Sequence, residues 1–345
     1  MSGKDFYNAC LEKLYSRKDL GIDEADQLLE VIFNQKLSEI QMTTLLTALA
    51  WKGESVSEIV GFARGMRRHA VKFVHDEEKV VDTAGTGGDS TKTFNISTAA
   101  AFVIAGAGIR VAKHGNRAIS GQCGSADVLA YLGVRVDAPK MVLEDCLKKC
   151  GITFLFAPAF HPAMRIVAKV RREMGTRTIF NLLGPLSNPA GVTRQIIGVC
   201  SPQLTEVFAQ VLDGLGSERA LIFSGEEGLD EISISGRTKL TELRRGSVQT
   251  RFLTPEDVGL SRSPSECLRG GDATENSRIL KEILEGSRNG PERDAVLLNA
   301  AAGIYVADKA DSLSSGLRLA RESLESGQAL YKLEQLIRLT NVPLV

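Results

Sequence analysis

From residue 79 onward, short apolar runs alternate with amphipathic segments, and this alternation constrains the fold more than any other feature of the sequence. The run KVVDTAG is followed by the helix-like NISTAAAFVIAGAG, and IRVAKHG is followed by SADVLAYLG. The pattern continues through ITFLFAP, TRQIIGVC and RALIFSG. Strands that alternate with helices predict an α/β fold with a mostly parallel central sheet flanked by helices. Ligands are then expected at the carboxyl ends of the strands.

The first 70 residues lack this alternation and predict a small helical domain. Apolar residues in QMTTLLTALAW recur at helical spacing, and we expect Trp51 to join them in filling the core. Two pairs fit the capping box, in which a hydroxyl and the side chain three residues later satisfy free amides at a helix start: Ser38 with Gln41, and Ser55 with Glu58. The region therefore predicts a bundle of capped helices.

The chain has 345 residues, which favours either one large domain with an appendage or two domains. We place a helical domain at 1–72 and an α/β domain at 73–345, with a segment near 172–190 joining the helical domain. Lys plus Arg and Asp plus Glu both number 42, which argues against nucleic acid as the main partner. No apolar run approaches the roughly 20 residues that span a bilayer, and the N-terminus has no apolar signal core. The six cysteines include no C-x-x-C pair, so we expect reduced thiols and a cytoplasmic protein.

The stretch VDTAGTGGDSTKTFNIST places a glycine cluster between a predicted strand and a predicted helix. It fails two nucleotide-binding motifs, because Ser90 replaces the third glycine of G-x-G-x-x-G and Thr91 replaces the glycine before Lys-Thr of a P-loop. Glycines nevertheless let backbone amides approach a phosphate, and a helix N-terminus carries positive partial charge. Asn95, Ser97 and Thr98 would stand at that N-terminus. A phosphate site and a plain glycine turn before a capped helix both remain open.

A second cluster, VAKHGNRAISGQCGSAD, supplies cations beside glycines and hydroxyls. Lys113, His114 and Arg117 lie within five residues of one another, and Asn116 could donate to a carbonyl or carboxylate. His114 need not be a base, since it could equally orient a ligand by a hydrogen bond. The alternative is a basic surface loop.

Two further features are ambiguous on spacing alone. Asp230 and Glu231 follow a predicted strand and a glycine turn, and neighbouring carboxylates suit magnesium that keeps water and binds substrate phosphate. They also suit a solvated turn. Arg165, Arg171 and Arg172 could simply form the wet face of the predicted helix HPAMRIVAKVRREMG. The sequence contains no Ser-His-Asp or Cys-His arrangement that would indicate covalent catalysis. It also contains no ligand spacing typical of a zinc site.

Four segments, taken in this order, closely resemble the anthranilate phosphoribosyltransferase family. They are DTAGTGGDSTKTFNIST, VAKHGNRAISGQCGSADVL, LFAPAFHPAMRIVAKVRREMGTRTIFNLLGPLSNPA and GLDEIS, which cover the central half of the chain. The family transfers the 5-phosphoribosyl group of 5-phosphoribosyl 1-diphosphate to the amine of anthranilate, a step of tryptophan biosynthesis that releases diphosphate. The resemblance implies this reaction, both substrates, Mg²⁺ as two ions, and a homodimer formed through the N-terminal helices.

The resemblance also implies a set of site residues. Those expected to bind phosphoribosyl diphosphate are Gly85, Gly88, Asp89, Thr93, Asn95, Ile96, Ser97, Thr98, Lys113, His114, Gly115, Asn116, Arg117, Ala118, Ile119, Ser120, Gly121 and Ser125. Gly85, Asn116 and Arg171 are expected to meet anthranilate, with the arginine on its carboxylate. Ser97, Asp230 and Glu231 are expected to hold magnesium. Lys113, Arg171 and Asn116 would carry catalysis, by stabilising the leaving group and orienting the nucleophile.

One departure from the family pattern is visible at residues 121–123, where Gly-Gln-Cys stands in place of the Ser-Lys-Ser common in the family. Contacts from those side chains are therefore not implied, although backbone contacts are. Two rival functions share much of the same pattern. A pyrimidine nucleoside phosphorylase has a similar fold and glycine loop but lacks KHGNR and the acidic pair in this form. A non-catalytic relative that binds nucleic acid is disfavoured by the zero net charge.

Overall fold

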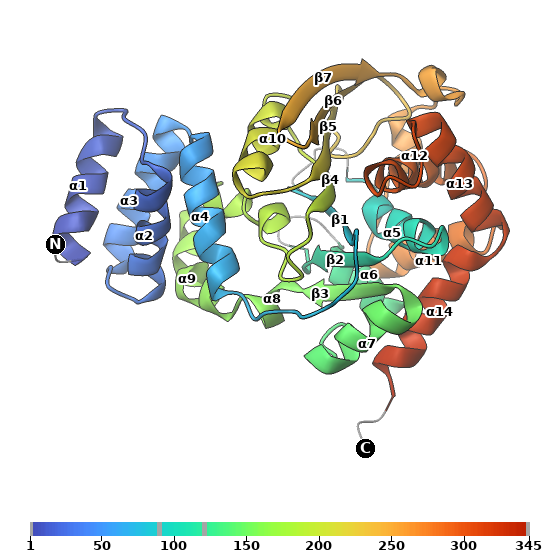
Figure 1. The fold of residues 1–345 in the computed structure, drawn as a ribbon, viewed down its shortest axis with the longest axis horizontal. Coiled ribbons are helices and arrows are strands. Elements are labelled where there is room, and N and C mark those ends of the chain that lie inside the picture. Colours follow the sequence, from blue (N-terminus) through green and yellow to red (C-terminus); the bar gives the residue numbers. More distant parts are fainter. Residues whose placement is uncertain (1–2, 88–91, 119–122, 343–345) are drawn as a thin grey trace.

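The computed structural model describes residues 3–87, 92–118 and 123–342 as a helical domain beside a larger α/β domain (Figure 1). One seven-stranded sheet, in the order β3-β2-β1-β4-β5-β6-β7, forms the centre of the α/β domain. Its strands are β1 (Val81–Gly85), β2 (Val111–Gly115), β3 (Ile152–Phe156), β4 (Arg194–Gly198), β5 (Arg219–Gly225), β6 (Thr238–Arg244) and β7 (Ser247–Leu253). The first five strands are parallel, and β6 and β7 form an antiparallel hairpin at one edge. The predicted mostly parallel sheet is confirmed.

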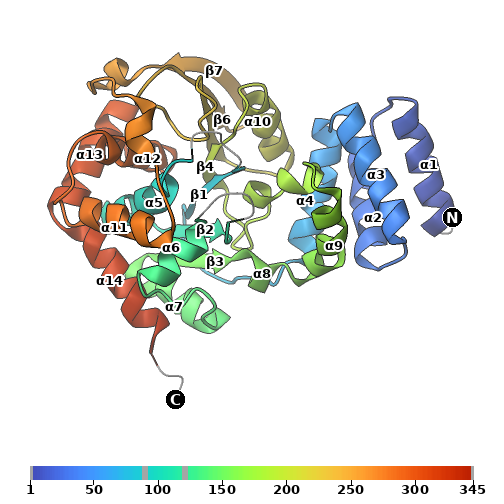
Figure 2. The same cartoon turned by 180° about the vertical axis from the view of Figure 1, so that it is seen from behind.

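The helical domain is built from α1 (Gly3–Tyr15), α2 (Ile22–Phe33), α3 (Glu39–Lys52) and α4 (Val56–His69). Both predicted capping boxes are present, at the starts of α3 and α4. A fifth helix, α9 (Arg165–Met174), comes from the middle of the chain and packs on α2 and α3 (Figure 2). The prediction that Trp51 fills the core was wrong. Its side chain is 58% exposed, because the last turn of α3 turns this position outward while Leu45, Leu46 and Leu49 point inward.

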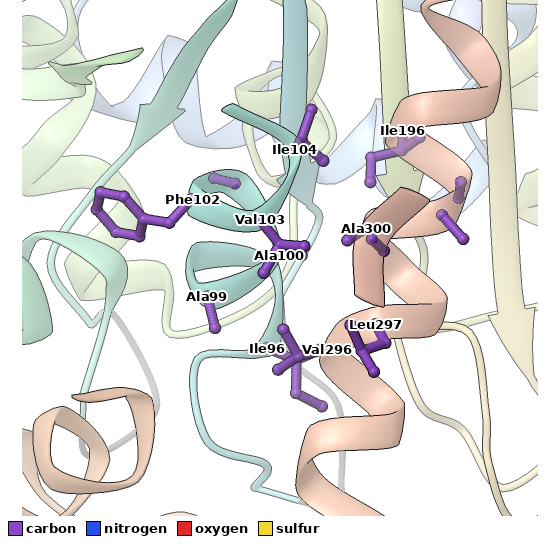
Figure 3. Close-up of a cluster of buried hydrophobic side chains, with 14 of the residues drawn as sticks. Ile96, Ala99, Ala100, Phe102, Val103, Ile104, Ile196, Val296, Leu297 and Ala300 are labelled. Atoms are coloured by element: carbon purple, nitrogen blue, oxygen red, sulfur yellow. The ribbon is translucent and has the colours of Figure 1, made fainter. Parts of the chain in front are cut away.

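Helices α5 (Ile96–Gly106) and α12 (Pro291–Val306) lie side by side against one face of the sheet (Figure 3). Small residues bring them close: a Cβ on Gly303 would lie 2.2 Å from Cδ1 of Ile104. Further helices surround this pair or cover the sheet edges, namely α6 (Ser125–Tyr131), α7 (Lys140–Cys150), α8 (Ala157–Phe160), α11 (Ala273–Leu284), α13 (Leu313–Glu325) and α14 (Gln328–Thr340). Tight packing thus fixes α5, whose N-terminus lies at the carboxyl edge of the sheet, after β1.

The other face of the sheet shares a hydrophobic core with the helical domain. Ile197 of β4 and Ile222 of β5 belong to the same buried cluster as Phe208 of α10 (Leu204–Gly214) and Phe62 of α4. The Arg67 side chain of α4 reinforces this junction by donating to the carbonyl of Leu186, 2.7 Å away. The two domains are therefore packed together and not merely linked. In the described part of the chain, no helix is long and apolar enough to cross a membrane.

Candidate functional site

The loop after β5 crosses the carboxyl ends of β1 and β4 and carries the acidic pair there. A Cβ on Gly198 would lie only 1.7 Å from the Asp230 carbonyl oxygen, so any side chain at 198 would displace the loop. On the β1 side, Oδ2 of Asp230 accepts a hydrogen bond of 3.0 Å from the backbone N–H of Gly87. A Cβ on Gly85 would meet the same carboxylate at 2.9 Å. Glycine at 85 and 198 therefore lets this carboxylate lie directly against the glycine loop.

Ser97, Lys113 and Glu231 meet at the N-terminus of α5. The Lys113 side chain is 4% exposed, and its Nζ lies 3.2 Å from Oγ of Ser97 and donates to the carbonyl of Thr83. The backbone N–H of Ser97 donates to Oε1 of Glu231 over 3.2 Å. Helix-terminal amides favour negative charge, so this position suits an anionic ligand or carboxylate. The structure thus brings a cation, a hydroxyl and an acid to one point on the sheet edge.

Burial lowers the pKa of Lys113, while the carboxylates of Asp82, Glu231 and Asp230 act in the opposite direction. Removing an ammonium group from water disfavours its charged form, and nearby carboxylates restore it. A buried lysine beside three acids therefore interacts with them through a low dielectric, where electrostatic effects are stronger than in water. The charge of Lys113 is accordingly an important part of the site's electrostatics.

The neighbouring His114 points to the opposite face of the sheet, as strand alternation requires. Its Nδ1 donates to the carbonyl of Gly184 over 3.1 Å, and its ring lies 5.1 Å from that of His161. Burial, followed by the influence of His161, lowers the pKa of His114 to about 3. Burial also raises the pKa of Asp82, which accepts from the His114 backbone, to about 6. The His114 side chain is therefore a neutral group away from Ser97, and the backbone N–H of this residue is bonded to Asp82.

The loop after β2 folds back on the start of α6. Oγ of Ser125 donates to the Asn116 carbonyl over 3.3 Å, and a Cβ on Gly115 would lie 2.2 Å from that hydroxyl. The Arg117 guanidinium pairs with Asp127 at 2.8 Å, and the other carboxylate oxygen of Asp127 accepts from the amides of Ala118 and Gly124. Sequence reasoning missed Asp127, although its place three residues after Gly124 at the start of α6 is a capping signal. The pairing means that Asp127 holds Arg117 as part of the loop.

The remaining predicted residues fall into three groups. Gly88, Asp89, Ile119, Ser120 and Gly121 lie outside the described residues. Ile96 and Thr98 are buried in α5, and Thr93 forms an isolated β-bridge with Arg269. The backbone N–H of Ile96 donates to the Phe94 carbonyl and that of Thr98 donates to the Asn95 carbonyl, so both amides are bonded within the chain.

Arg171 belongs to the helical domain, in the last turn of α9. Its guanidinium lies 5.6 Å above the ring of Phe180 and is half-buried, whereas the next residue, Arg172, is exposed. Burial lowers the pKa of Arg171. A partly desolvated guanidinium gains from a carboxylate partner, so Arg171 is better suited than Arg172 to hold an anionic ligand group.

Two buried asparagines near the site were missed by sequence reasoning. Asn299 of α12 accepts from the backbone N–H of Ile232, 3.0 Å away, and so anchors the chain directly after Glu231. Asn276 of α11 donates to Asn95 at the start of α5 over 3.0 Å. An asparagine inside an apolar helix such as AVLLNAAAGIYVA is a detectable signal, because buried amides need partners. The partner itself cannot be read from the sequence.

The donors fit a hard cation such as magnesium better than zinc or copper. Within the described residues, no group of three or more His, Cys, Asp or Glu side chains could hold a metal ion. The available ligands are the oxygens of Asp230, Glu231 and Ser97, hard donors that magnesium prefers. A site with few protein ligands suits an ion that keeps water and takes substrate phosphate oxygens.

Comparison with known families assigns a class to this fold and site. Residues 77–330 match the glycosyl transferase family a/b domain, and residues 8–70 match the helical bundle domain of the same family. The two matches correspond to the α/β domain and the N-terminal helices. The chain is thus a glycosyltransferase of the class that combines these two domains.

Individual relatives narrow the class. The chain is 50% identical over 329 residues to anthranilate phosphoribosyltransferase of Moorella thermoacetica, covering 95% of this chain and 97% of the relative. The crystal structure of the Thermus thermophilus enzyme is 42% identical, with a TM-score of 0.92 over 96% of this chain and 99% of that one. The Saccharomyces cerevisiae enzyme in complex with PRPP and Mg is 30% identical, with a TM-score of 0.89 over 97% of both chains. This chain belongs to the anthranilate phosphoribosyltransferase family.

Proposed function

We infer that the protein transfers the 5-phosphoribosyl group from 5-phosphoribosyl 1-diphosphate to the amine of anthranilate in tryptophan biosynthesis. The products are N-(5-phosphoribosyl)anthranilate and diphosphate. The reaction is supported by relatives that are all anthranilate phosphoribosyltransferases and that align with 95–97% of this chain. The observation that carries it in the structure is the meeting of Ser97, Lys113 and Glu231 at the N-terminus of α5.

The leaving diphosphate would lie between the glycine loop and the start of α5. The helix N-terminus contributes positive partial charge, and the Lys113 ammonium lies 3.2 Å from the Ser97 hydroxyl, while the Ser97 N–H donates to Glu231. As the bond between ribose C1 and the diphosphate breaks, negative charge grows on the leaving group and positive charge on the sugar. Fixed donors aimed at that growing charge lower the barrier without having to reorganise.

Magnesium, as two ions, would be held by Ser97, Asp230 and Glu231. When bound, it would neutralise charge on the diphosphate oxygens and so assist departure of the leaving group. Asp230 and Glu231 are positioned by backbone donors from Gly87 and Ser97, which fixes both carboxylates at the sheet edge.

Anthranilate would be oriented by Gly85, Asn116 and Arg171, with Arg171 on its carboxylate. An aryl amine is a neutral nucleophile at pH 7, so the reaction needs no strong base. The described residues near Lys113 agree with this, since the nearby His114 is neutral and turned to the other face. Catalysis then rests on positioning and electrostatics.

Replacing Arg171 by alanine should raise the KM for anthranilate much more than the KM for phosphoribosyl diphosphate. A charged bidentate contact contributes roughly 1.5 to 3 kcal/mol, or about ten- to a hundredfold. Arg172→Ala is the matched control, because Arg172 is the exposed neighbour on the same helix turn. Steady-state kinetics with each substrate varied in turn would measure both effects. Equal losses for both substrates would remove the proposed role of Arg171.

The activity itself is tested by mixing the purified protein with anthranilate, phosphoribosyl diphosphate and magnesium. Loss of anthranilate fluorescence reports turnover. Absence of turnover, together with phosphorolysis of thymidine, would favour the nucleoside phosphorylase alternative. Free thiols in the described chain are compatible with a reducing cytoplasm, where we expect the protein to act.

We further propose a homodimer formed through the N-terminal helices. Large apolar side chains are exposed on α1 and α3, among them Tyr15, Ile40 and Trp51. Tyr15 and Trp51 line a surface hollow of about 460 Å³ together with Thr43, Thr44, Thr47 and Ala48. Exposed aromatic groups around a hollow are typical of protein interfaces. The exposure of Trp51, which contradicted its predicted place in the core, is explained if a second copy covers it.

Replacing Trp51 by glutamate should shift this dimer to monomers. A buried interface tryptophan commonly contributes about 2 kcal/mol or more, which is roughly thirtyfold in Kd. Light scattering across a dilution series measures the change. Met141→Glu is the control, because Met141 is also exposed but lies on α7 in the other domain. An unchanged mass for Trp51→Glu at every concentration would place the interface elsewhere.

A further inference from the structure

A hydrogen-bonded relay connects α11 to the start of α5. The backbone N–H of Gly271 donates to Oδ1 of Asn276 over 2.8 Å. Nδ2 of Asn276 donates to Oδ1 of Asn95 over 3.0 Å, and Nδ2 of Asn95 donates to the Cys123 carbonyl over 3.3 Å. The relay joins three parts of the chain that lie side by side where α11 contacts α5 and α6 (Figure 2).

The relay fixes which end of each amide faces which partner. A backbone N–H can only donate, so the atom of Asn276 that meets Gly271 must be its oxygen. The nitrogen of Asn276 then faces Asn95, and only the Asn95 oxygen can accept from it. Asn95 must therefore present its nitrogen to the loop after β2. Because that nitrogen carries two hydrogens, the bond to Cys123 leaves a second hydrogen for a ligand oxygen.

Close packing holds the relay in place at Asn276. Asn276 is 2% exposed, and a Cβ on Gly270 would lie 2.5 Å from its Oδ1. The backbone before α11 pairs with the end of the glycine loop: Phe94 donates to the Leu268 carbonyl over 3.0 Å, and Gly270 donates to the Lys92 carbonyl over 3.0 Å. Asn95 stands at the N-cap position of α5, yet its side chain does not cap the helix. Its amide is committed to the relay instead.

We propose that Asn276 is a positioning residue for phosphoribosyl diphosphate, acting through Asn95. It turns the Asn95 amide so that a donor, and not an acceptor, faces the anionic ligand at the N-terminus of α5. The inference rests on the proposed function. The Gln-Cys departure in the loop touches this arrangement, because Cys123 accepts from Asn95 through its backbone carbonyl and its thiol also hydrogen-bonds the Asn276 side chain.

A double-mutant cycle tests the dependence of one residue on the other. Asn95→Ala removes the donor and should raise the KM for phosphoribosyl diphosphate about tenfold, while Asn276→Ala, which frees the Asn95 amide to rotate, should raise it about fivefold. In the Asn95→Ala background, Asn276→Ala should then cause no further rise, because the residue it orients is gone. Calorimetric binding of magnesium and phosphoribosyl diphosphate without anthranilate should show the same non-additive pattern.

A second variant reverses the relay without deleting it. Asn276→Asp keeps the bond from Gly271, but its carboxylate can only accept, so the Asn95 amide must turn and present its oxygen to the ligand. The KM for phosphoribosyl diphosphate should rise more than in Asn276→Ala, with the KM for anthranilate nearly unchanged. Thr274→Asp adds the same charge at an exposed position in the same helix turn and should leave both values unchanged.

Equal effects of Asn276→Ala in the two backgrounds would show that Asn276 does not act through Asn95 and would overturn the inference. So would an Asn276→Asp variant that binds phosphoribosyl diphosphate as well as the unaltered protein. Both results leave the proposed function intact. An unaltered protein that neither turns over nor binds phosphoribosyl diphosphate would overturn the proposed function and this inference together.

Discussion

Replacing Lys113 by methionine should lower kcat by about a hundred- to a thousandfold, the usual effect of removing one preorganised group that stabilises transition-state charge. Methionine keeps the length of the side chain but removes the ammonium that lies between Thr83 and Ser97. Three carboxylates, those of Asp82, Asp230 and Glu231, would then lose the nearby cation with which they interact. The loss should appear in single-turnover kinetics, which isolate the chemical step.

Lys92→Met is the control for this experiment. Lys92 belongs to the Lys-Thr pair that imitates a P-loop in the sequence, but its side chain is exposed. Its replacement should leave kcat within about twofold, since methionine removes an exposed charge and keeps the backbone carbonyl that accepts from Gly270. Thermal unfolding of both variants separates a catalytic loss from a folding loss. A Lys113→Met protein that folds normally and retains kcat would disprove the electrostatic role.

The second large effect concerns the acidic pair. Changing Asp230 to asparagine and Glu231 to glutamine together should raise the magnesium concentration needed for half-maximal activity by about a hundredfold, given roughly 1.5 kcal/mol for each charged contact. Both amides keep the shape of the side chains but lose the charge that a hard cation requires. Activity should recover in part at high magnesium, and binding of manganese alone, followed by electron paramagnetic resonance, should weaken in parallel.

Glu226→Gln is the matched control for the acidic pair. It removes one charge from the same loop, where Glu226 is exposed and pairs with Arg237 at 2.7 Å. Its magnesium titration should match that of the unaltered protein. If the double variant also shows an unchanged titration, the metal is not bound by Asp230 and Glu231.

The fold could be predicted from the sequence because its signals are local. Strand and helix alternation indicated the parallel sheet, and a serine followed three residues later by Gln41 or Glu58 indicated the capped helices. Part of the site follows from the same logic, since segments after parallel strands must meet at one edge. Strand alternation could also have separated Lys113 from His114, whose side chains occupy opposite faces of the sheet.

The missed residues act through contacts that the local sequence does not encode. Asn276 and Asn95 are 181 positions apart, and nothing in ENSRIL indicates which group the buried amide meets. Trp51 was assigned to the core because its neighbours follow helical spacing, yet its ring lies at the surface, 4.5 Å from the Arg17 guanidinium. Helical spacing of apolar residues predicts which residues lie on one face of a helix. It does not predict whether that face packs within the same molecule.

The core shared by the two domains also limits how the protein can be divided. A fragment beginning at residue 73 would lose α4 from a cluster that includes Phe208, Ile197 and Ile222 and would leave that apolar surface in water. A fragment ending at residue 72 would lack α9, which returns to the bundle from the middle of the chain. The boundary between the two family matches therefore does not mark a site at which truncation would give two stable fragments. An exchange of the helical bundle between relatives should therefore include α9 and keep the contact of α4 with α10.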